Sequence, residues 1–152
     1  MHAGEYNFNN FTPVVKAMNL YLYVDKITTN PNKFPEYIFT EKQINDKTVL
    51  IVQCREDSLI NLVRKHTYQI YMLCWTANEI NLNKEPYRKN ERLGKQLKAI
   101  ELCGEHLAEV QLCKSRFHLT YKRMKHWGNM TLEVRDSIQA WHKSDRDRYK
   151  NI

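Results

Sequence analysis

The sequence predicts an all-α protein, an antiparallel four-helix bundle with an insertion between its first and second helices. The main evidence is two long runs of apolar residues at helical steps of three, four and seven in the C-terminal half. A short segment between them ends in Thr120, which can cap the second run. We therefore predict a helical hairpin with two apolar faces, Leu93, Leu97, Ile100, Gly104 and Leu107 followed by Met124, Trp127, Val134, Ile138 and Trp141.

A first helix is predicted from Thr12 to about Thr29. Proline is favoured in the first turn of a helix, where Pro13 stands, and Asn30-Pro31 marks the end. The residues before this helix, 1–11, contain several asparagines and are expected to be loosely ordered. The expected core face of the helix consists of Ala17, Leu20, Val24 and Ile27.

The second helix is predicted from about Asp57 to Asn81 and is preceded by an insertion at residues 36–54. Within the insertion, residues 48–52 are rich in β-branched side chains. This pattern fits either a short strand or the first turns of the next helix, so we assign no structure to it. The expected core face of the second helix consists of Leu59, Val63, Ile70, Leu73 and Ala77.

Both of these helices carry a second apolar stripe. A helix that is apolar on two sides buries both sides. A central helix in one bundle can do so against two neighbours, whereas an oligomer can do so against another subunit. We favour an oligomer interface made of Val14, Met18, Tyr21, Tyr68, Met72 and Trp75.

The composition fits one domain spanning residues 1–152. The chain has 42% hydrophobic residues and a formal net charge of +7, which makes a polyanion the first partner to consider. A soluble protein that is merely basic is the alternative. We find no apolar run long enough for a membrane span and no signal sequence at the start, so we expect a cytoplasmic protein. The spacing of Cys54, Cys74, Cys103 and Cys113 favours reduced thiols, not disulfides or zinc ligands.

Basic residues gather near the start of the third helix and the start of the fourth. Long cations in this arrangement can form an electrostatic groove for phosphates, flanked by Tyr87, Tyr121 and Trp127 as stacking surfaces. A solvated face of helix-favouring residues is the alternative. The predicted nucleic-acid-binding residues are Arg88, Arg92, Lys95, Lys98, Lys122, Arg123 and Lys125.

An enzyme is the competing hypothesis. Arg135 and His142 are seven residues apart and so share a helix face, similar to the Arg-x(4–6)-His motif of HEPN ribonucleases. Asp136, directly after the arginine, slightly favours this hypothesis, but the pair lacks a further convergent acid or base, so we predict no catalytic residues. We also expect neither a metal nor a cofactor: Glu105 and His106 are adjacent and point apart, and His66 fits a hydrogen-bonded core residue.

The order of these elements resembles a known family. The chain has, in order, a helix ending in Phe34-Pro35, a helix ending near Ala77-Asn78, a basic loop and a hairpin closing on Trp141, and this order resembles the accessory variability determinant (Avd) of diversity-generating retroelements. This family belongs to a group of small bacterial four-helix bundles related to proteins encoded in ribosomal RNA intervening sequences. The likeness is best over residues 97–144. The chain departs from the family in its longer segment 36–54 and in Gln139-Ala140, where a glycine pair is expected.

The resemblance implies a basic homopentameric barrel that binds the retroelement's reverse transcriptase and its template RNA. Such a protein supports mutagenic cDNA synthesis without catalysis of its own. A protein–protein adaptor that does not bind nucleic acid is a further alternative.

Overall fold

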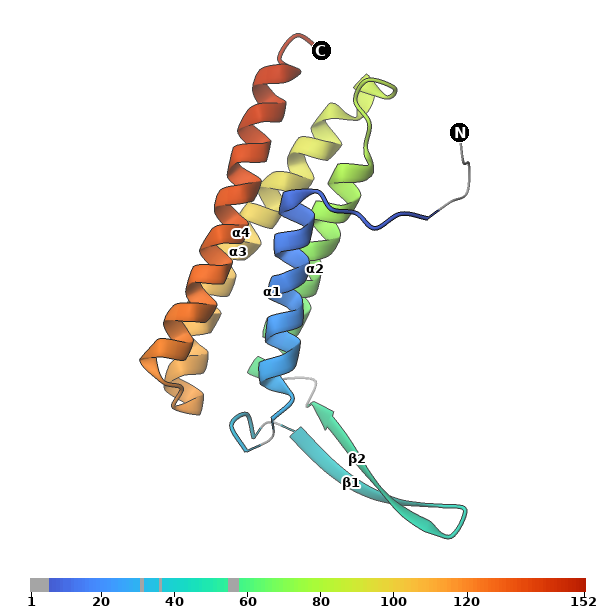
Figure 1. Ribbon diagram of the computed structural model, residues 1–152, viewed down its shortest axis with the longest axis vertical. Coiled ribbons are helices and arrows are strands. Elements are labelled where there is room, and N and C mark those ends of the chain that lie inside the picture. The colour runs from blue at the N-terminus through green and yellow to red at the C-terminus, as the bar shows by residue number, and fades with distance from the viewer. Residues whose placement is uncertain (1–5, 31, 36, 55–57) are drawn as a thin grey trace.

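The computed structural model describes residues 6–30, 32–35, 37–54 and 58–152, and it is mostly helical. Four helices lie side by side in an antiparallel bundle, and a β-hairpin projects from one end (Figure 1). Packing joins α1 to α2, α2 to α3, α3 to α4 and α4 back to α1, so the bundle is closed. The helices are α1 (Thr12–Thr28), α2 (Leu59–Glu79), α3 (Lys89–Phe117) and α4 (Tyr121–Arg148), with a short 3₁₀ turn at Pro86–Arg88.

The predicted helical bundle is confirmed, but the all-α class is wrong because the insertion folds as a β-hairpin. Its strands β1 (Tyr37–Ile44) and β2 (Lys47–Cys54) pair antiparallel, with Phe39 opposite Val52. The connecting residues Asn45 and Asp46 have φ angles of 51° and 61°. Two successive positive φ angles define the turn that matches the right-handed twist of paired strands. The asparagine–aspartate pair was the available sequence signal for this turn.

Helices α1 and α2 use the core faces that their periodicity predicts. Proline occupies the first turn of α1, and Ser58 caps α2 by accepting a hydrogen bond from the backbone N–H of Asn61 at 2.9 Å. Leu59 and Leu73 are only partly buried. The predicted helix start at Asp57 and the predicted stop at Pro31 lie outside the described residues, as do residues 1–5 of the predicted loose N-terminus. Buried members of these faces are Ala17, Leu20, Val24, Ile27, Val63, Ile70 and Ala77.

The predicted core face of α3 is wrong. Leu97 is 53% exposed and Gly104 is exposed, while Leu93, Ile100 and Leu107 are only partly buried. Helix α3 instead buries a face about a third of a turn away, which mixes small, aromatic and polar residues. Hydrogen bonds to α4 and a close contact between Glu109 and His66 on α2 engage its polar members, so burial follows polar pairing as well as hydrophobicity. The buried face consists of Gln96, Ala99, Leu102, Cys103, His106, Glu109, Val110, Cys113 and Phe117.

Helix α4 buries the predicted apolar face, with Trp127, Val134, Ile138 and Trp141 inside and Met124 partly buried. Thr120 caps the helix as predicted, because its hydroxyl accepts a hydrogen bond from the N–H of Arg123 at 3.1 Å. Helix α3 is capped at its C-terminal end by His118, which adopts the left-handed conformation at φ 53°.

Cys74 and Cys103 are free thiols buried in the bundle, as the sequence suggests, and Cys113 is buried as well. Burial raises the pKa of both Cys74 and Cys103 to about 12, so these thiols stay protonated and unreactive. None of the helices in the described part of the chain is long and apolar enough to cross a membrane.

Candidate nucleic-acid interface

The predicted basic groove is divided between the two ends of the bundle. Helices α3 and α4 run antiparallel, so the cations near the start of α3 lie far from those at the start of α4 (Figure 1). Lys98 is separated from the end of α3 at Phe117 by about 28 Å of helix, at 1.5 Å per residue. The two groups therefore form two separate surfaces, not one groove.

Two of the cations at the α3 end are engaged with acidic side chains. The guanidinium of Arg88 donates to Glu91 at 2.8 and 2.9 Å and to Glu85 at 3.1 Å. The hydrogen bond from Arg88 lowers the pKa of Glu91, so this acid remains charged and offsets the arginine. Arg92 is also paired, with side-chain exposure of only 13%. Neither guanidinium is presented to solvent as an unpaired charge.

Arg92 belongs to a polar cluster inside the bundle. It donates to both carboxylate oxygens of Asp145, at 2.7 and 3.1 Å, and to the carbonyl of Ile80 at 2.6 Å. Gln96 donates to the same carboxylate at 2.6 Å. The guanidinium also lies 5.4 Å from the ring centroid of Trp141. These contacts assign Arg92 a structural role that joins α3 to α4.

Lys95 and Lys98 lie beside an apolar groove of about 380 Å³ between α2 and α3. The Lys95 ammonium donates to the hydroxyl of Thr76 at 3.1 Å, and the Lys98 ammonium lies 3.6 Å from Glu101. Met72 and Leu73 form part of the groove floor. Lys98 remains more than half exposed, so it is the most accessible of the predicted cations at this end.

The start of α4 presents its cations differently. Lys122 and Lys125 are exposed, Arg123 is partly buried, and the first turn of the helix contains no acid. The N-terminal end of a helix carries a partial positive charge, so cations there repel the helix dipole as well as one another. Burial raises the pKa of Tyr23 on α1, and the adjacent Arg123 opposes that rise. The first turn of α4 thus concentrates positive charge without an acid of its own.

Sequence reasoning missed two further cations here, Lys114 and Arg116 near the end of α3. No acid occurs between Glu109 and Glu133, and this segment contains five Lys and Arg residues. The antiparallel turn at residues 118–120 folds the segment back on itself and brings its two halves to one end. The absence of acids across a helical turn was the signal that could have found these residues.

The three predicted stacking residues lie in different environments. Tyr121 is 66% exposed beside the α4 cations, and Tyr87 is 80% exposed at the opposite end. Trp127 is fully buried, and its indole N–H donates to His106 at 2.9 Å. Trp127 is therefore a core residue and offers no surface to a base.

The predicted oligomer stripes are partly used within the chain. Val14 is 1% exposed and belongs to the bundle core. Tyr68 is 49% exposed and meets the partly buried Tyr21 edge-on, with ring centroids 6.0 Å apart. Met72 lines the groove between α2 and α3, and Trp75 hydrogen-bonds Glu79. The part of the two stripes that remains available for an oligomer interface is therefore a smaller surface around Tyr68.

The two residues of the candidate ribonuclease pair differ in their contacts. Gln96 lies 2.9 Å from Nδ1 of His142, and burial, with a smaller contribution from Arg146, lowers the pKa of this histidine. Nε of Arg135 is buried without a hydrogen-bond partner in the described part of the chain, and its charge opposes the raised pKa of Cys103.

His66, predicted to be a hydrogen-bonded core residue, is only partly buried: its Nδ1 lies 2.6 Å from a carboxylate oxygen of the buried Glu109, but without hydrogen-bond geometry. The other oxygen of Glu109 lies 3.0 Å from Nδ1 of His106. No group of three or more His, Cys, Asp or Glu side chains arranged to hold a metal occurs among the described residues.

No family model, no curated protein and no solved structure matches this chain.

Proposed function

We propose that this protein is a non-catalytic nucleic-acid-binding accessory protein that acts in the cytoplasm. Its principal contact with the phosphate backbone is the α4-start surface, defined here as Lys114, Lys122, Arg123 and Lys125. The observation that carries the proposal is the set of cations at the positive end of α4, where the first turn has no acid. Such an arrangement destabilises an isolated helix and becomes favourable when a polyanion binds.

The chemistry of this surface favours backbone recognition over sequence reading. Lysine is a flexible point charge, and phosphate contacts set position and affinity without specifying bases. The exposed ring of Tyr121 adds a stacking surface for an unpaired base. We therefore propose RNA or single-stranded cDNA as the ligand, with little dependence on sequence.

The proposed partner is a reverse transcriptase of a diversity-generating retroelement. This part of the proposal rests on the resemblance of the helix order and of residues 97–144 to the Avd family, together with the basic charge of the chain. The bundle would hold template RNA near the polymerase, as a homo-oligomer for which the resemblance implies five subunits.

RNA binding measured at several salt concentrations tests the proposal. In Lys122→Gln/Lys125→Gln, two phosphate contacts are lost, so the slope of log affinity against log salt should fall by about two units. Lys95→Gln/Lys98→Gln is the matched control, because it removes the same charge from the opposite end. An unchanged slope in the first variant, or an equal loss in the control, would contradict the assignment to the α4-start surface.

The polymerase role is tested with the same two variants. Each is added to a reverse transcriptase of a diversity-generating retroelement with its template RNA, and cDNA yield is measured. The Lys122→Gln/Lys125→Gln variant should support less cDNA synthesis than the original protein. An equal cDNA yield with and without this protein would refute the accessory role but would not refute RNA binding.

A further inference from the structure

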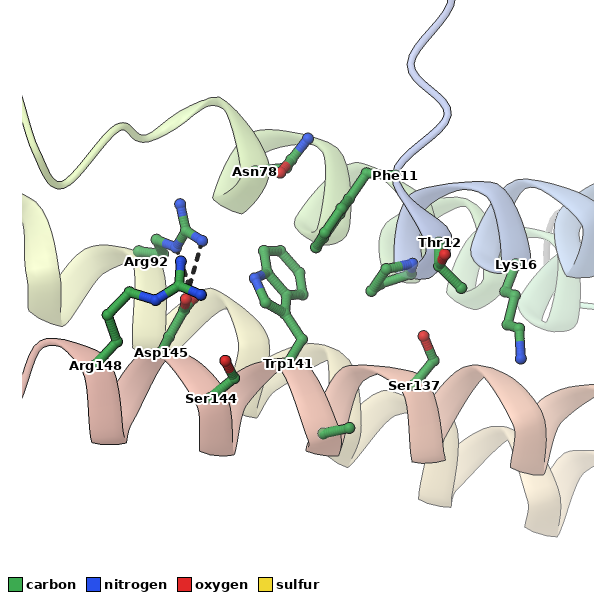
Figure 2. Close-up of a pocket in the computed structure, with 12 residues that line it drawn as sticks. Phe11, Thr12, Lys16, Asn78, Arg92, Ser137, Trp141, Ser144, Asp145 and Arg148 are labelled. Atoms are coloured by element: carbon green, nitrogen blue, oxygen red, sulfur yellow. Dashed lines mark hydrogen bonds and ion pairs between the residues drawn. The ribbon is translucent and has the colours of Figure 1, made fainter.

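A pocket of about 490 Å³ lies between the start of α1, the end of α2 and the C-terminal half of α4 (Figure 2). Its walls include Phe11 and Lys16 from the α1 side, Asn78 from α2, and Trp141 and Arg148 from α4. The α4 residues that line the pocket lie between Ser137 and Arg148, toward the opposite end of this helix from the α4-start surface. The pocket is therefore a binding site separate from the α4-start surface.

The indole nitrogen of Trp141 is the first sign of a ligand. Among the three tryptophans, Trp75 donates its N–H to Glu79 and Trp127 donates to His106. Trp141 is 7% exposed, yet its indole N–H has no hydrogen-bond partner in the described part of the chain. A buried donor without an acceptor costs about 1–3 kcal/mol. Figure 2 shows this nitrogen on the edge of the ring that faces Asp145 and Arg148, away from Phe11.

The charge of the pocket determines which acceptor fits. Asp145 accepts two hydrogen bonds from Arg92 and one from Gln96, and the Arg92–Asp145 pair is neutral. Arg148 is exposed and contacts the ring of Tyr149 at 6.0 Å, but neither it nor Lys16 forms an ion pair within the described residues. The pocket therefore has two uncompensated positive charges.

The hydroxyls of Ser137 and Ser144 also lie on the α4 wall, and both can donate hydrogen bonds. Together with the indole N–H, the guanidinium and the ammonium, they make a site dominated by donors. A site of this kind fits a doubly charged group with several acceptor oxygens, and phosphate has that chemistry.

The other side of the pocket is aromatic. The rings of Phe11 and Trp141 meet edge to face, with centroids 5.1 Å apart, and the amide of Asn78 stands above them (Figure 2). An amide offers both a donor and an acceptor to a flat heterocycle. We propose that this pocket binds a nucleoside phosphate monoester, either as a free nucleoside monophosphate or as the 5′-phosphorylated terminal nucleotide of a strand.

Nuclear magnetic resonance of the ¹⁵N-labelled protein tests this directly, because each indole N–H gives its own signal. Adding AMP should move the assigned Trp141 signal in a saturable manner, since the indole gains an acceptor. The Trp75 and Trp127 signals serve as internal controls, because both donors are already engaged. Adenosine should not move the Trp141 signal comparably, because it lacks the phosphate.

The variant Arg148→Gln should weaken AMP binding at least about tenfold through loss of a charge-assisted hydrogen bond. Its matched control is Lys150→Gln, which removes an exposed charge outside the pocket. An unmoved Trp141 signal, an equal response to adenosine, or equal affinity in Arg148→Gln would overturn the proposal.

Two RNA oligonucleotides distinguish the sources of the phosphate. A response of Trp141 to a 5′-phosphorylated oligonucleotide but not to its 5′-hydroxyl counterpart assigns the pocket to strand ends. A response to AMP alone assigns it to a free nucleotide. Binding of the 5′-hydroxyl oligonucleotide through the α4-start surface is measured in the same samples, so the pocket and the proposed function can fail separately.

Discussion

At the scale of single residues, paired polar side chains hold the buried face of α3 in place. Because Trp127 donates to Nε2 of His106, neutral His106 carries its proton on Nδ1 and can donate it to Glu109. Glu109 in turn contacts His66 on α2. The chain thus links α4 to α3 and α3 to α2 through groups that are almost entirely excluded from water.

Breaking the Arg92–Asp145 pair should be costly. In Arg92→Met, Asp145 keeps its charge at 3% side-chain exposure and loses two hydrogen bonds. We expect the free energy of unfolding to fall by about 3 kcal/mol, because a buried charge is left uncompensated. Urea unfolding measures the change.

The double variant Arg92→Met/Asp145→Asn provides the control, because it also removes the stranded charge. It should recover at least half of the loss. A single variant as stable as the original protein would show that the pair is not structural. An unchanged salt slope for RNA binding by folded Arg92→Met is the second expected outcome, since this arginine lies inside the bundle.

His142 should make stability depend on pH. Burial lowers its pKa in the folded state, and Arg146 adds to this while Asp145 opposes it. The unfolded chain therefore binds a proton more readily, and stability is lost as the pH falls through the unfolded value near 6.5.

The variant His142→Gln should lose less stability between pH 7.5 and pH 5.5 than the original protein does. Glutamine keeps a donor within reach of Gln96 and does not titrate. Unfolding by denaturant at the two pH values gives the comparison, and parallel losses in both proteins would exclude His142 as the source.

At the scale of elements, α3 has two different faces. Its regular leucine stripe points outward, and a Cβ added at Gly104 on that stripe would meet no atom within 4 Å. A mid-helix glycine costs about 1 kcal/mol relative to alanine, and packing within the chain does not require this one. Leu97 and Tyr68, both about half exposed, thus leave apolar surface on α3 and on α2.

We predict that the protein self-associates through the surface around Tyr68. Tyr68→Lys should reduce the mass measured by light scattering, because it places a charge on a half-exposed apolar contact. Tyr87→Lys is the matched control, since Tyr87 is 80% exposed and lies outside the stripes. A monomeric original protein at micromolar concentration would refute self-association, and equal effects of the two variants would refute the location.

The β-hairpin contributes little to the bundle core. Its described side chains are exposed except for the partly buried Ile51, and Phe39, Leu50 and Val52 on one face are each about half exposed. An isolated two-stranded ribbon is marginally stable in water. The internal turn at Asn45-Asp46 and the hydrogen bond from Gln43 to Thr48 at 2.8 Å are the contacts that stabilise its tip.

At the scale of the whole molecule, the two ends of the bundle differ in their charge. The end formed by the α3–α4 turn has cations without acidic neighbours along the chain from residue 110 to 132. The other end has arginines neutralised by Glu85, Glu91 and Asp145, with Lys16 and Arg148 remaining over a pocket. We propose that the net charge of +7 acts through two distinct sites, the α4-start surface for a nucleic-acid backbone and the pocket for a nucleotide.

The sequence by itself determined the four helices, because 3.6-residue periodicity, Pro13 and Thr120 are local signals. It also determined the core faces of α1, α2 and α4, where apolar residues dominate the buried stripe. Only the tertiary structure decided which face of α3 is buried, because Gln96, His106 and Glu109 find partners that lie far away in the chain. Antiparallel packing likewise separated cations that the sequence groups together, and it created the pocket beside Trp141 from three helices. Local periodicity reports hydrophobicity along one helix, whereas long-range pairing depends on which helices meet.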